Sequence, residues 1–339
     1  MNEKEQIGVP ESGDRVLWIC FSAFGDVLQD LANVRNFKKR FPEVRLTFLS
    51  EPEYAELARK QPYIDDVLTG YKKPFAEWRR IVRKIRAGRY QWLVNTHQGG
   101  KSSFLTIFSR AEHRIGTAHV FFFKGIYHAS LDHWNRLCGV DVHDRSFPLN
   151  FASAEDKESA LAYLSRLPKP RLFAVIGASR VWKMWPAEQW IEFLRPLVNN
   201  DGWGVVLNGH GPAEEAMGRQ IESALGSGNV LNLVGGLDFK KMSGVVHYCT
   251  MALGNDTGPI HLAALSGVPT MGLFNYPAEA AALDLLNVPW FRELCAGDYA
   301  AYVEGELPLK NLRAEIVTKT FDAFAAEFLP RAFAWRGEL

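Results

Sequence analysis

The stretch "TMALGNDTGPIHLAALSGVPTMGLF", residues 250–274, decides the fold class of this chain. Residues 250–253 are apolar and are closed by Gly254, as is typical of the end of a buried strand. Residues 260–265 form an apolar helical run that Gly267 stops, and residues 270–274 begin another apolar strand. A strand, a helix and a second strand in this order indicate a right-handed βαβ unit of a parallel sheet.

The turn between the first strand and the helix carries the sequence Asn-Asp-Thr-Gly-Pro, residues 255–259. Asp256 and Thr257 are good N-cap residues, and Pro259 fits the first turn, where its missing N–H group would be unbonded anyway. A helix start offers free N–H groups and a partial positive charge, so this turn could bind a phosphate. An ordinary capped helix is the competing interpretation of the same residues.

The same alternation of strands and helices runs through both halves of the chain. It predicts an α/β fold with two doubly wound, Rossmann-like domains that face each other across a cleft and bind ligands at the carboxyl ends of their strands. Besides the opening segment, the predicted strands are residues 15–21, 44–50, 65–70, 91–96, 171–178, 204–209 and 230–235, and the predicted helices are residues 26–42, 53–62, 76–90, 187–198, 213–225 and 239–249.

We expect an N-terminal domain over residues 1–155 and a linker over residues 156–170, where a charged helix is closed by two prolines. The C-terminal domain then covers residues 171–315. An amphipathic stretch over residues 316–339 predicts a terminal helix.

Composition places the chain among globular proteins large enough for two domains. It has 339 residues, of which 47% are hydrophobic and 23% charged. No apolar run approaches the roughly 20 residues of a membrane span, and the polar first fourteen residues lack the apolar core of a signal peptide. Four widely spaced cysteines without a CxxC pair favour reduced core thiols. A cytoplasmic location is therefore expected.

Positive charge is concentrated in the first half of the chain. Residues 1–150 contain 23 Lys and Arg against 17 Asp and Glu, a net charge of +6, and the remaining residues carry a net −5. Much of the excess lies in residues 71–92, with eight basic residues against Glu77 alone. This stripe could be a solvated helix face, or it could bind a phosphorylated substrate or the inner leaflet of the cytoplasmic membrane. Nucleic acid is the least favoured partner, because no motif that reads nucleic acid accompanies the stripe.

The first motif with chemical potential follows the first predicted strand, in "SAFGDVLQD". Gly25 allows a tight turn, and Asp26 stands at the start of the next helix. An exposed carboxylate there could act as a general base on a sugar hydroxyl, which typically contributes about 10²–10⁴-fold to a rate. A simple helix cap is the alternative.

The second motif, "SRVWKMWPAEQW", follows the predicted strand at residues 171–178. Ser179, Arg180 and Lys183 lie in a loop at the expected ligand crevice, where a cation could neutralise a leaving diphosphate. The tryptophans of this segment, Trp182, Trp185 and Trp190, are expected to be packing anchors.

Other functional classes find little support. The segment "NTHQGGKSS" nearly matches a P-loop, but the first required glycine is Asn95. No GxGxxG follows a strand, and the histidines show no metal-binding spacing. A kinase, a dinucleotide dehydrogenase and a metal site are therefore disfavoured.

Taken together, three motifs resemble those of glycosyltransferase family 9, the heptosyltransferases of bacterial lipopolysaccharide synthesis. They are "SAFGD" at residues 22–26, "KMWP" at residues 183–186 and "DTGPIHLAA" at residues 256–264. The resemblance implies the GT-B fold, ADP-heptose as donor, an inverting reaction, and neither a metal nor another cofactor. It also implies an anionic glycolipid, the Kdo/heptose inner core of lipopolysaccharide, as the acceptor.

The resemblance further implies roles for individual residues. Asp26 would be the catalytic base, and Lys183 would stabilise the leaving diphosphate. Asp256 would orient its turn and contact the donor without binding a metal. The residues implied in donor binding are Ser179, Arg180, Asp256, Thr257, Gly258 and His261, and those implied in acceptor binding are Ser22, His97 and Lys101.

The chain also departs from the family pattern. Many members continue Gly-Pro-Thr-Asp-Pro after the strand at residues 270–274, whereas this chain has Asn275 to Glu279 in a different sequence. Another nucleotide-sugar or a different acceptor is therefore an open alternative. A nucleotide-sugar epimerase, which would tolerate Asp26→Asn, and a non-catalytic sugar-nucleotide binder are two further ones.

Overall fold

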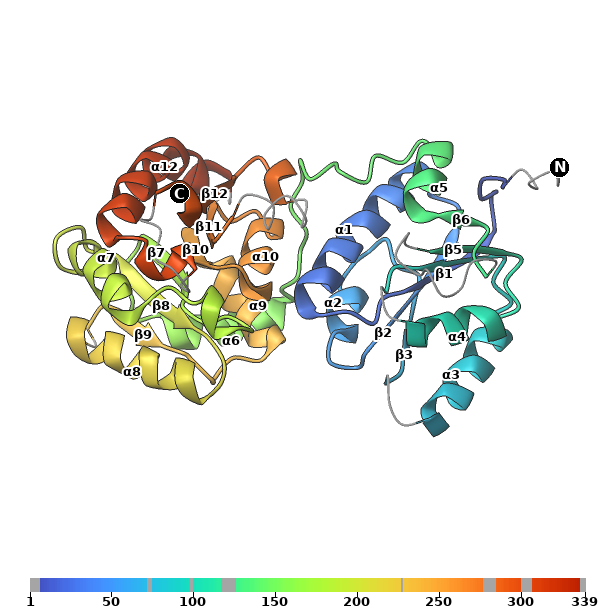
Figure 1. The fold of residues 1–339 in the computed structure, drawn as a ribbon, viewed down its shortest axis with the longest axis horizontal. Coiled ribbons are helices and arrows are strands. Elements are labelled where there is room, and N and C mark those ends of the chain that lie inside the picture. The colour runs from blue at the N-terminus through green and yellow to red at the C-terminus, as the bar shows by residue number, and fades with distance from the viewer. Residues whose placement is uncertain are drawn as a thin grey trace. The chain divides into compact units, whose positions relative to one another are not determined.

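The chain folds into two compact units, Met1–Asp144 and Arg145–Leu339, each built on a six-stranded parallel sheet (Figure 1). The computed structural model describes residues 7–71, 75–97, 100–116, 126–226, 228–276, 285–299 and 307–335. Two parallel sheets flanked by helices confirm the predicted α/β class with two Rossmann-like domains.

The sheet of the first unit has the strand order β3-β2-β1-β4-β5-β6. Its core is formed by side chains such as Leu17, Ile19 and Leu93, each fully buried between the sheet and its helices. The elements of this unit are β1 (Arg15–Ile19), α1 (Phe24–Arg40), β2 (Arg45–Ser50), α2 (Ala55–Arg59), β3 (Asp66–Thr69), α3 (Phe75–Gly88), β4 (Trp92–Asn95), α4 (Gly100–Phe108), β5 (His113–Gly116), β6 (Ala129–Ser130) and α5 (Leu131–Cys138).

The sheet of the second unit has the order β12-β11-β10-β7-β8-β9. Four of its strands, β7, β8, β10 and β11, are buried along their whole length, as expected for a parallel sheet covered on both faces. The elements are α6 (Ala154–Leu164), β7 (Arg171–Val175), η2 (Val181–Lys183), α7 (Ala187–Asn199), β8 (Gly204–Asn208), α8 (Pro212–Leu225), β9 (Val230–Asn232), α9 (Phe239–His247), β10 (Met251–Asn255), α10 (Gly258–Leu265), β11 (Thr270–Phe274), η3 (Leu285–Asn287), β12 (Phe291–Cys295), η4 (Ala296–Asp298), η5 (Pro308–Asn311) and α12 (Ala314–Trp335).

Each sheet has one point where the strand order reverses. In the first unit this switch point lies between β1 and β4, with Ile19 opposite Asn95. In the second unit it lies between β7 and β10, with Val175 opposite Gly254. Open α/β sheets bind ligands beyond the carboxyl ends of the strands at such points. The loops after these four strands are therefore where a site is expected.

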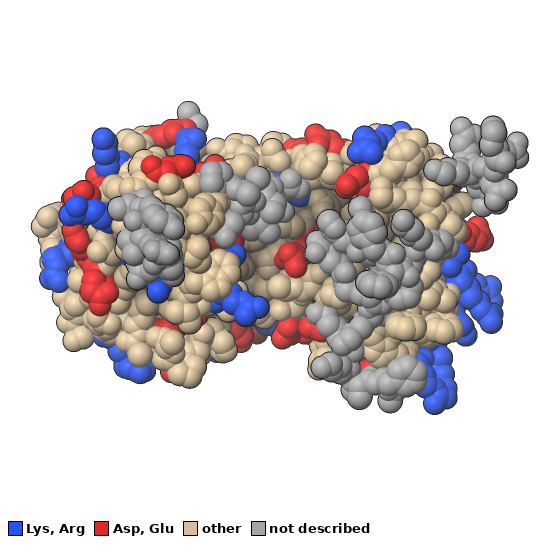
Figure 2. Space-filling view, viewed as in Figure 1, with Lys and Arg blue, Asp and Glu red and all other residues tan. Residues whose placement is uncertain are grey.

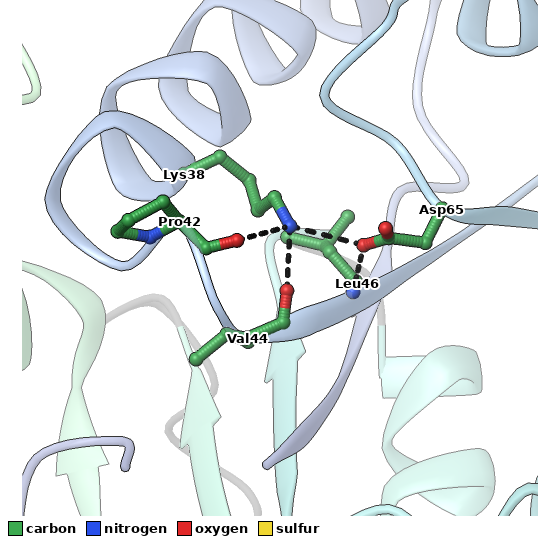
Figure 3. Close-up of polar contacts among 5 residues, drawn as sticks. All are labelled: Lys38, Pro42, Val44, Leu46 and Asp65. Carbon is green, nitrogen blue, oxygen red and sulfur yellow. Dashed lines mark hydrogen bonds and ion pairs between the residues drawn. The ribbon is translucent and has the colours of Figure 1, made fainter. Parts of the chain in front are cut away.

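The turn from α1 into β2 is closed by one lysine (Figure 3). Lys38 Nζ donates hydrogen bonds to the carbonyl oxygens of Pro42 (3.1 Å) and Val44 (2.5 Å) and to Asp65 Oδ2 (3.1 Å). Asp65 Oδ2 also accepts from the Leu46 N–H at 2.7 Å. This ammonium group ties the C-terminus of α1 to the start of β2 and to the segment before β3.

The boundary between the units falls at residue 144, whereas the sequence predicts a domain end at 155 and a linker over 156–170. Residues 154–164 instead form α6, which packs on α9 within the second unit. Gly244 makes this packing close, because a Cβ atom there would lie 2.2 Å from the Asp156 carbonyl oxygen. The predicted linker helix is thus part of the second unit's core.

The C-terminal helix α12 belongs to the second unit. Phe321 packs edge-on against Phe193 of α7, with ring centroids 5.4 Å apart, and against Trp203 at 5.8 Å. In the part of the chain that the structure describes, no helix is long and apolar enough to span a bilayer.

Candidate active site

Asn255 organises the switch point of the second sheet. Its fully buried side chain donates from Nδ2 to the Ile176 carbonyl oxygen at 2.7 Å and accepts at Oδ1 from the Trp185 N–H at 3.1 Å. The loop after β7 and the start of α7 are therefore tied to the end of β10. Sequence reasoning missed this role, although Asn255 is the first residue of the predicted phosphate-binding turn.

Lys183, Asp256 and His261 form one cluster at this point. Lys183 Nζ donates to Asp256 Oδ2, and His261 Nε2 lies 3.5 Å from Asp256 Oδ1. The "KMWP" and "DTGPIHLAA" motifs, separated by about seventy positions, thus meet through their charged residues. Of the predicted site residues, the structure thus brings Lys183, Asp256 and His261 together at the switch point of the second sheet.

The carboxyl of Asp256 is held ionised by this cluster. Burial raises its pKa, but hydrogen bonds from His261 and Lys183 and the charges of both residues outweigh burial, and the net pKa lies below the ordinary value. Asp256 therefore remains an anion, and it holds the side chains of Lys183 and His261 together at the switch point.

The start of α10 offers a backbone donor beside this cluster. Thr257 is the N-cap residue, with extended backbone angles and no side-chain capping bond, and Pro259 lies in the first turn without an N–H group. The Ile260 N–H donates to the Thr257 carbonyl oxygen at 3.0 Å, whereas the Gly258 N–H has no partner among the described residues. A phosphate oxygen could accept from Gly258 at this position.

The loop between β7 and α7 is largely exposed. Ser179 and Arg180 are exposed, and Trp182 is 41% exposed with its ring 5.3 Å from Lys183 Nζ. The packing role predicted for the tryptophans is correct for Trp185 and Trp190, which are fully buried, and wrong for Trp182. Trp182 sits on η2, a single turn that has no inward face to bury the ring.

Glu214 supports the same loop from α8 and was not predicted. Its carboxylate accepts from the backbone N–H groups of Ala178 (3.1 Å) and His210, and a Cβ atom on Gly177 would lie 1.7 Å from Glu214 Oε2. Burial raises the pKa of Glu214, and the two N–H groups oppose that rise. Glu214 thus holds together the loops that follow β7 and β8.

Asp26 lies at the switch point of the first sheet, in the first turn of α1. The helix begins after Ala23, whose side chain makes no capping bond, so Asp26 is not the cap of this helix. Its carboxylate is exposed, and none of the described residues pairs with it. This arrangement leaves the carboxylate able to accept a proton, as a general base must.

Two predicted acceptor residues meet beside this turn. Ser22 Oγ lies 3.3 Å from His97 Nδ1, which joins the loops after β1 and β4. The third, Lys101, is in the first turn of α4, but its side chain lies outside the described residues.

A buried carboxyl, Asp30, lies one helical turn beyond Asp26. It bonds with the Thr96 hydroxyl and with the Cys20 thiol. Burial, followed by the smaller effect of the Asp26 charge, raises the pKa of Asp30 to about 6, although these hydrogen bonds oppose the rise. The Thr96 hydroxyl also lies 3.1 Å from the Ile19 carbonyl oxygen, so it can donate there when a protonated Asp30 donates to it.

Asn95 anchors a second polar network beneath the predicted acceptor loop. Its Nδ2 donates to hydroxyl oxygens of Ser102 (3.0 Å), Thr106 (3.2 Å) and Tyr127 (2.8 Å), and its Oδ1 accepts from the His97 N–H at 3.2 Å. Ser102, the last residue of the near P-loop match, is therefore part of a structural network in the first unit.

The segment that departs from the family pattern is described only at its start. Asn275 is buried and accepts at Oδ1 from the Leu309 N–H at 3.1 Å, so it fixes η5. Residues 277–279 lie outside the described residues. Across the residues that the structure describes, no group of three or more His, Cys, Asp and Glu side chains could hold a metal ion.

Sequence comparison relates the chain to known glycosyltransferases. The family model described as glycosyltransferase family 9 (heptosyltransferase) matches residues 78–281. Lipopolysaccharide heptosyltransferase 3 of Escherichia coli is 22% identical over 318 residues, which cover 85% of this chain and 89% of that protein.

Structural comparison agrees on the fold. A glycosyl transferase of family 9 from Veillonella parvula superposes with a TM-score of 0.81 at 18% identity, covering 94% of this chain and 99% of that one. The E. coli heptosyltransferase WaaC with ADP-2-deoxy-2-fluoro heptose superposes with a TM-score of 0.65 at 18% identity, covering 91% and 99%. These neighbours have the GT-B fold that the sequence predicts.

Proposed function

The chain belongs to glycosyltransferase family 9, and from this we propose that it transfers heptose from ADP-heptose to an anionic inner-core acceptor of lipopolysaccharide. The observation that carries the proposal is the Lys183–Asp256–His261 cluster beside the start of α10, at the switch point of the second sheet. The names of the relatives support the donor and the acceptor, since one is a lipopolysaccharide heptosyltransferase and one was solved with an ADP-heptose analogue.

The proposed reaction inverts the anomeric carbon and needs no metal or other cofactor. The Asp26 carboxylate takes the proton of the acceptor hydroxyl as its oxygen attacks the anomeric carbon from the face opposite the diphosphate. The bond between the anomeric carbon and the β-phosphate oxygen breaks, and ADP leaves with the bonding electrons. Lys183 and the Gly258 N–H stabilise the charge that develops on the diphosphate.

Within this proposal, Asp256 keeps Lys183 aimed at the diphosphate. A free carboxylate beside a diphosphate would repel it, but here Asp256 is shared between Lys183 and His261. Ser179 and Arg180, exposed in the same loop, are available to the donor, and Ser22, His97 and Lys101 are assigned to the acceptor. We place the reaction on the inner face of the cytoplasmic membrane, with residues 71–92 as a peripheral contact.

The test is transfer of heptose from ADP-heptose to a Kdo-containing lipid A acceptor, followed by mass spectrometry of the acceptor. Asp26→Asn is expected to lower kcat by about 10²–10⁴-fold with an unchanged melting temperature. Asp132→Asn is the matched control, because Asp132 is an exposed carboxylate in the first turn of α5 in the same unit. Equal activity of Asp26→Asn and wild type would exclude Asp26 as the base.

The departure after β11 supports a second candidate, transfer from another nucleotide-sugar or to an acceptor outside lipopolysaccharide. A melting-temperature panel with ADP, UDP, GDP and CDP separates these donors, because a ligand at a hundredfold excess over Kd stabilises the folded state by about 2.7 kcal/mol. A shift with UDP or GDP instead of ADP would exclude ADP-heptose. Conversion of the sugar without any acceptor would indicate an epimerase, and binding without turnover a sugar-nucleotide binder.

A further inference from the structure

Helices α3 and α4 of the first unit lie side by side and form one surface. The rings of Trp78 on α3 and Phe104 on α4 meet edge-on with centroids 6.3 Å apart. About two turns further along α3 and one turn further along α4, Arg86 Nε donates to the Phe108 carbonyl oxygen at 2.7 Å. These two contacts fix the helices against each other along their length.

Helix α4 buries polar as well as apolar side chains. Leu105 belongs to the hydrophobic core, but Ser102, Ser103 and Thr106 are also buried, and Asn95 donates to two of their hydroxyls. Because this network holds the polar face inside, the apolar face is directed to solvent. The outward residues are Phe104, Ile107 and Phe108, which are 49%, 37% and 48% exposed.

These three side chains are spaced i, i+3 and i+4, so they lie together on one helix face. Large apolar groups gathered at one exposed place commonly mark an interaction site, unlike apolar residues scattered singly.

The neighbouring face of α3 is strongly basic. Figure 2 shows Lys and Arg side chains gathered along the edge of the first unit where α3 lies, at the lower right. Glu77 of α3 pairs with Arg80 at 2.7 Å, and Glu112, after α4, is a further exposed acid nearby in sequence. The exposed basic residues of α3 and of the turn after it are Arg79, Arg80, Arg83, Lys84, Arg86 and Arg89.

We propose that this α3–α4 surface, defined by the three apolar residues of α4 and the exposed basic residues of α3, docks on an anionic lipid bilayer. Apolar side chains can enter the region between headgroups and acyl chains, while basic residues around them bind anionic headgroups. Neither feature alone selects a membrane. Exposed apolar side chains beside basic ones are complementary to an anionic membrane, because its headgroups are negatively charged and its interior is apolar.

The α3–α4 surface lies close to the residues proposed to bind the acceptor, which suggests what membrane binding would achieve. For this step alone, the inference rests on the proposed function, in which a membrane-anchored acceptor contacts His97, just after β4, and Lys101, in the first turn of α4. A bilayer bound by the far end of the same helix would present its lipids close to those residues, so the acceptor would not have to leave the membrane.

The first experiment is co-sedimentation of the full chain with vesicles of pure phosphatidylcholine and with vesicles that also contain phosphatidylglycerol. The protein should bind the anionic vesicles, bind the neutral ones much less, and lose binding as salt is raised. No binding to the anionic vesicles would overturn the proposal.

Two double variants then divide the surface into its parts. Arg79→Gln/Arg83→Gln should weaken binding about 30-fold, at about fivefold or slightly more per charge. Phe104→Ser/Phe108→Ser should weaken it at least about tenfold, since both rings are half exposed and enter the bilayer only in part. The controls are Lys240→Gln/Lys241→Gln and Leu161→Ser, which remove exposed residues of the same kinds from α9 and α6.

Other occupants of the surface give different results. Unchanged vesicle binding by both double variants would refute this surface, as would a dimer of the wild type that Phe104→Ser/Phe108→Ser converts to monomer. Binding of single-stranded RNA in place of anionic vesicles would also refute it. Vesicle binding without heptose transfer would contradict the proposed function and leave the membrane surface supported.

Discussion

Replacing Asp30 by asparagine should change how the stability of the first unit depends on pH. The carboxyl is 6% exposed, and its pKa rises from 3.8 to about 6 because burial disfavours the anion. The folded state therefore binds this proton more tightly than the unfolded state. The proton's contribution to stability is complete below about pH 4 and is lost as the pH rises through about 6.

The size of the effect follows from that difference. A rise of about two pKa units corresponds to about 3 kcal/mol, which the folded protein loses between pH 4 and pH 7 when Asp30 ionises. Asparagine has nearly the same shape, can accept from Thr96 and cannot ionise. The free energy of unfolding of Asp30→Asn, relative to wild type, should therefore increase by about 3 kcal/mol over the same range.

Urea unfolding measured from about pH 4 to about pH 8 tests this, with hydrogen exchange of α1 peptides identifying the transition of the first unit. Only the change with pH matters, since any lost hydrogen bond shifts the difference by a constant. Asp66→Asn, at an exposed carboxylate of β3, controls for the loss of one charge. A constant difference between Asp30→Asn and wild type at every pH would refute the reasoning, because Asp30 would then be ionised throughout.

Two further substitutions test the packing within each unit. Lys38→Met should cost about 1.5–3 kcal/mol of unfolding free energy, because it removes three hydrogen bonds from an ammonium group whose side chain is 11% exposed. Lys39→Met, whose side chain is 69% exposed, should stay within about 0.5 kcal/mol, and equal losses in urea unfolding would contradict this account of the α1 turn. Gly244→Ala should lower the stability of the second unit by about 1–3 kcal/mol, because its Cβ would overlap the Asp156 carbonyl of α6. Gly236→Ala, with its nearest contact at 3.6 Å, is the control, and a Gly244→Ala protein as stable as wild type would show that α6 is not packed as described.

The sequence predicted the strands around both switch points because these strands are short, apolar and closed by turn residues. It therefore also placed Asp26, Lys183 and Asp256 correctly at carboxyl ends of strands. The sequence does not show which strands are neighbours in the sheet, and the structure does. Only the pairing of β7 with β10 brings Lys183 onto Asp256, and local patterns carry no information on that pairing.

The sequence did not allow prediction of residues whose role depends on contacts with distant parts of the chain. Asp30 and Glu214 look like ordinary helix carboxylates in the sequence, and their burial depends on loops that lie distant along the chain. Helix α4 was missed for a related reason. Phe104, Ile107 and Phe108 face solvent because Asn95 bonds with the polar face of the helix, so the sequence pattern does not indicate a core-facing helix.

The predicted linker over residues 156–170 differs from the structure for another reason. Charged residues and two prolines are typical of a connection between domains, but residues 154–164 form a helix whose fit against α9 depends on Gly244. The cue for that packing is a single glycine about ninety positions away.

Calorimetric titration of ADP and of AMP tests whether Lys183 binds the diphosphate of an ADP-sugar, as proposed. A charge-assisted hydrogen bond contributes about 1.5–3 kcal/mol, so Lys183→Met should raise the Kd for ADP by about 10–150-fold. The Kd for AMP, which lacks the second phosphate, should change little, and Lys240→Met should leave both unchanged. An ADP affinity that survives Lys183→Met, or a wild-type protein that binds AMP as tightly as ADP, would contradict the account.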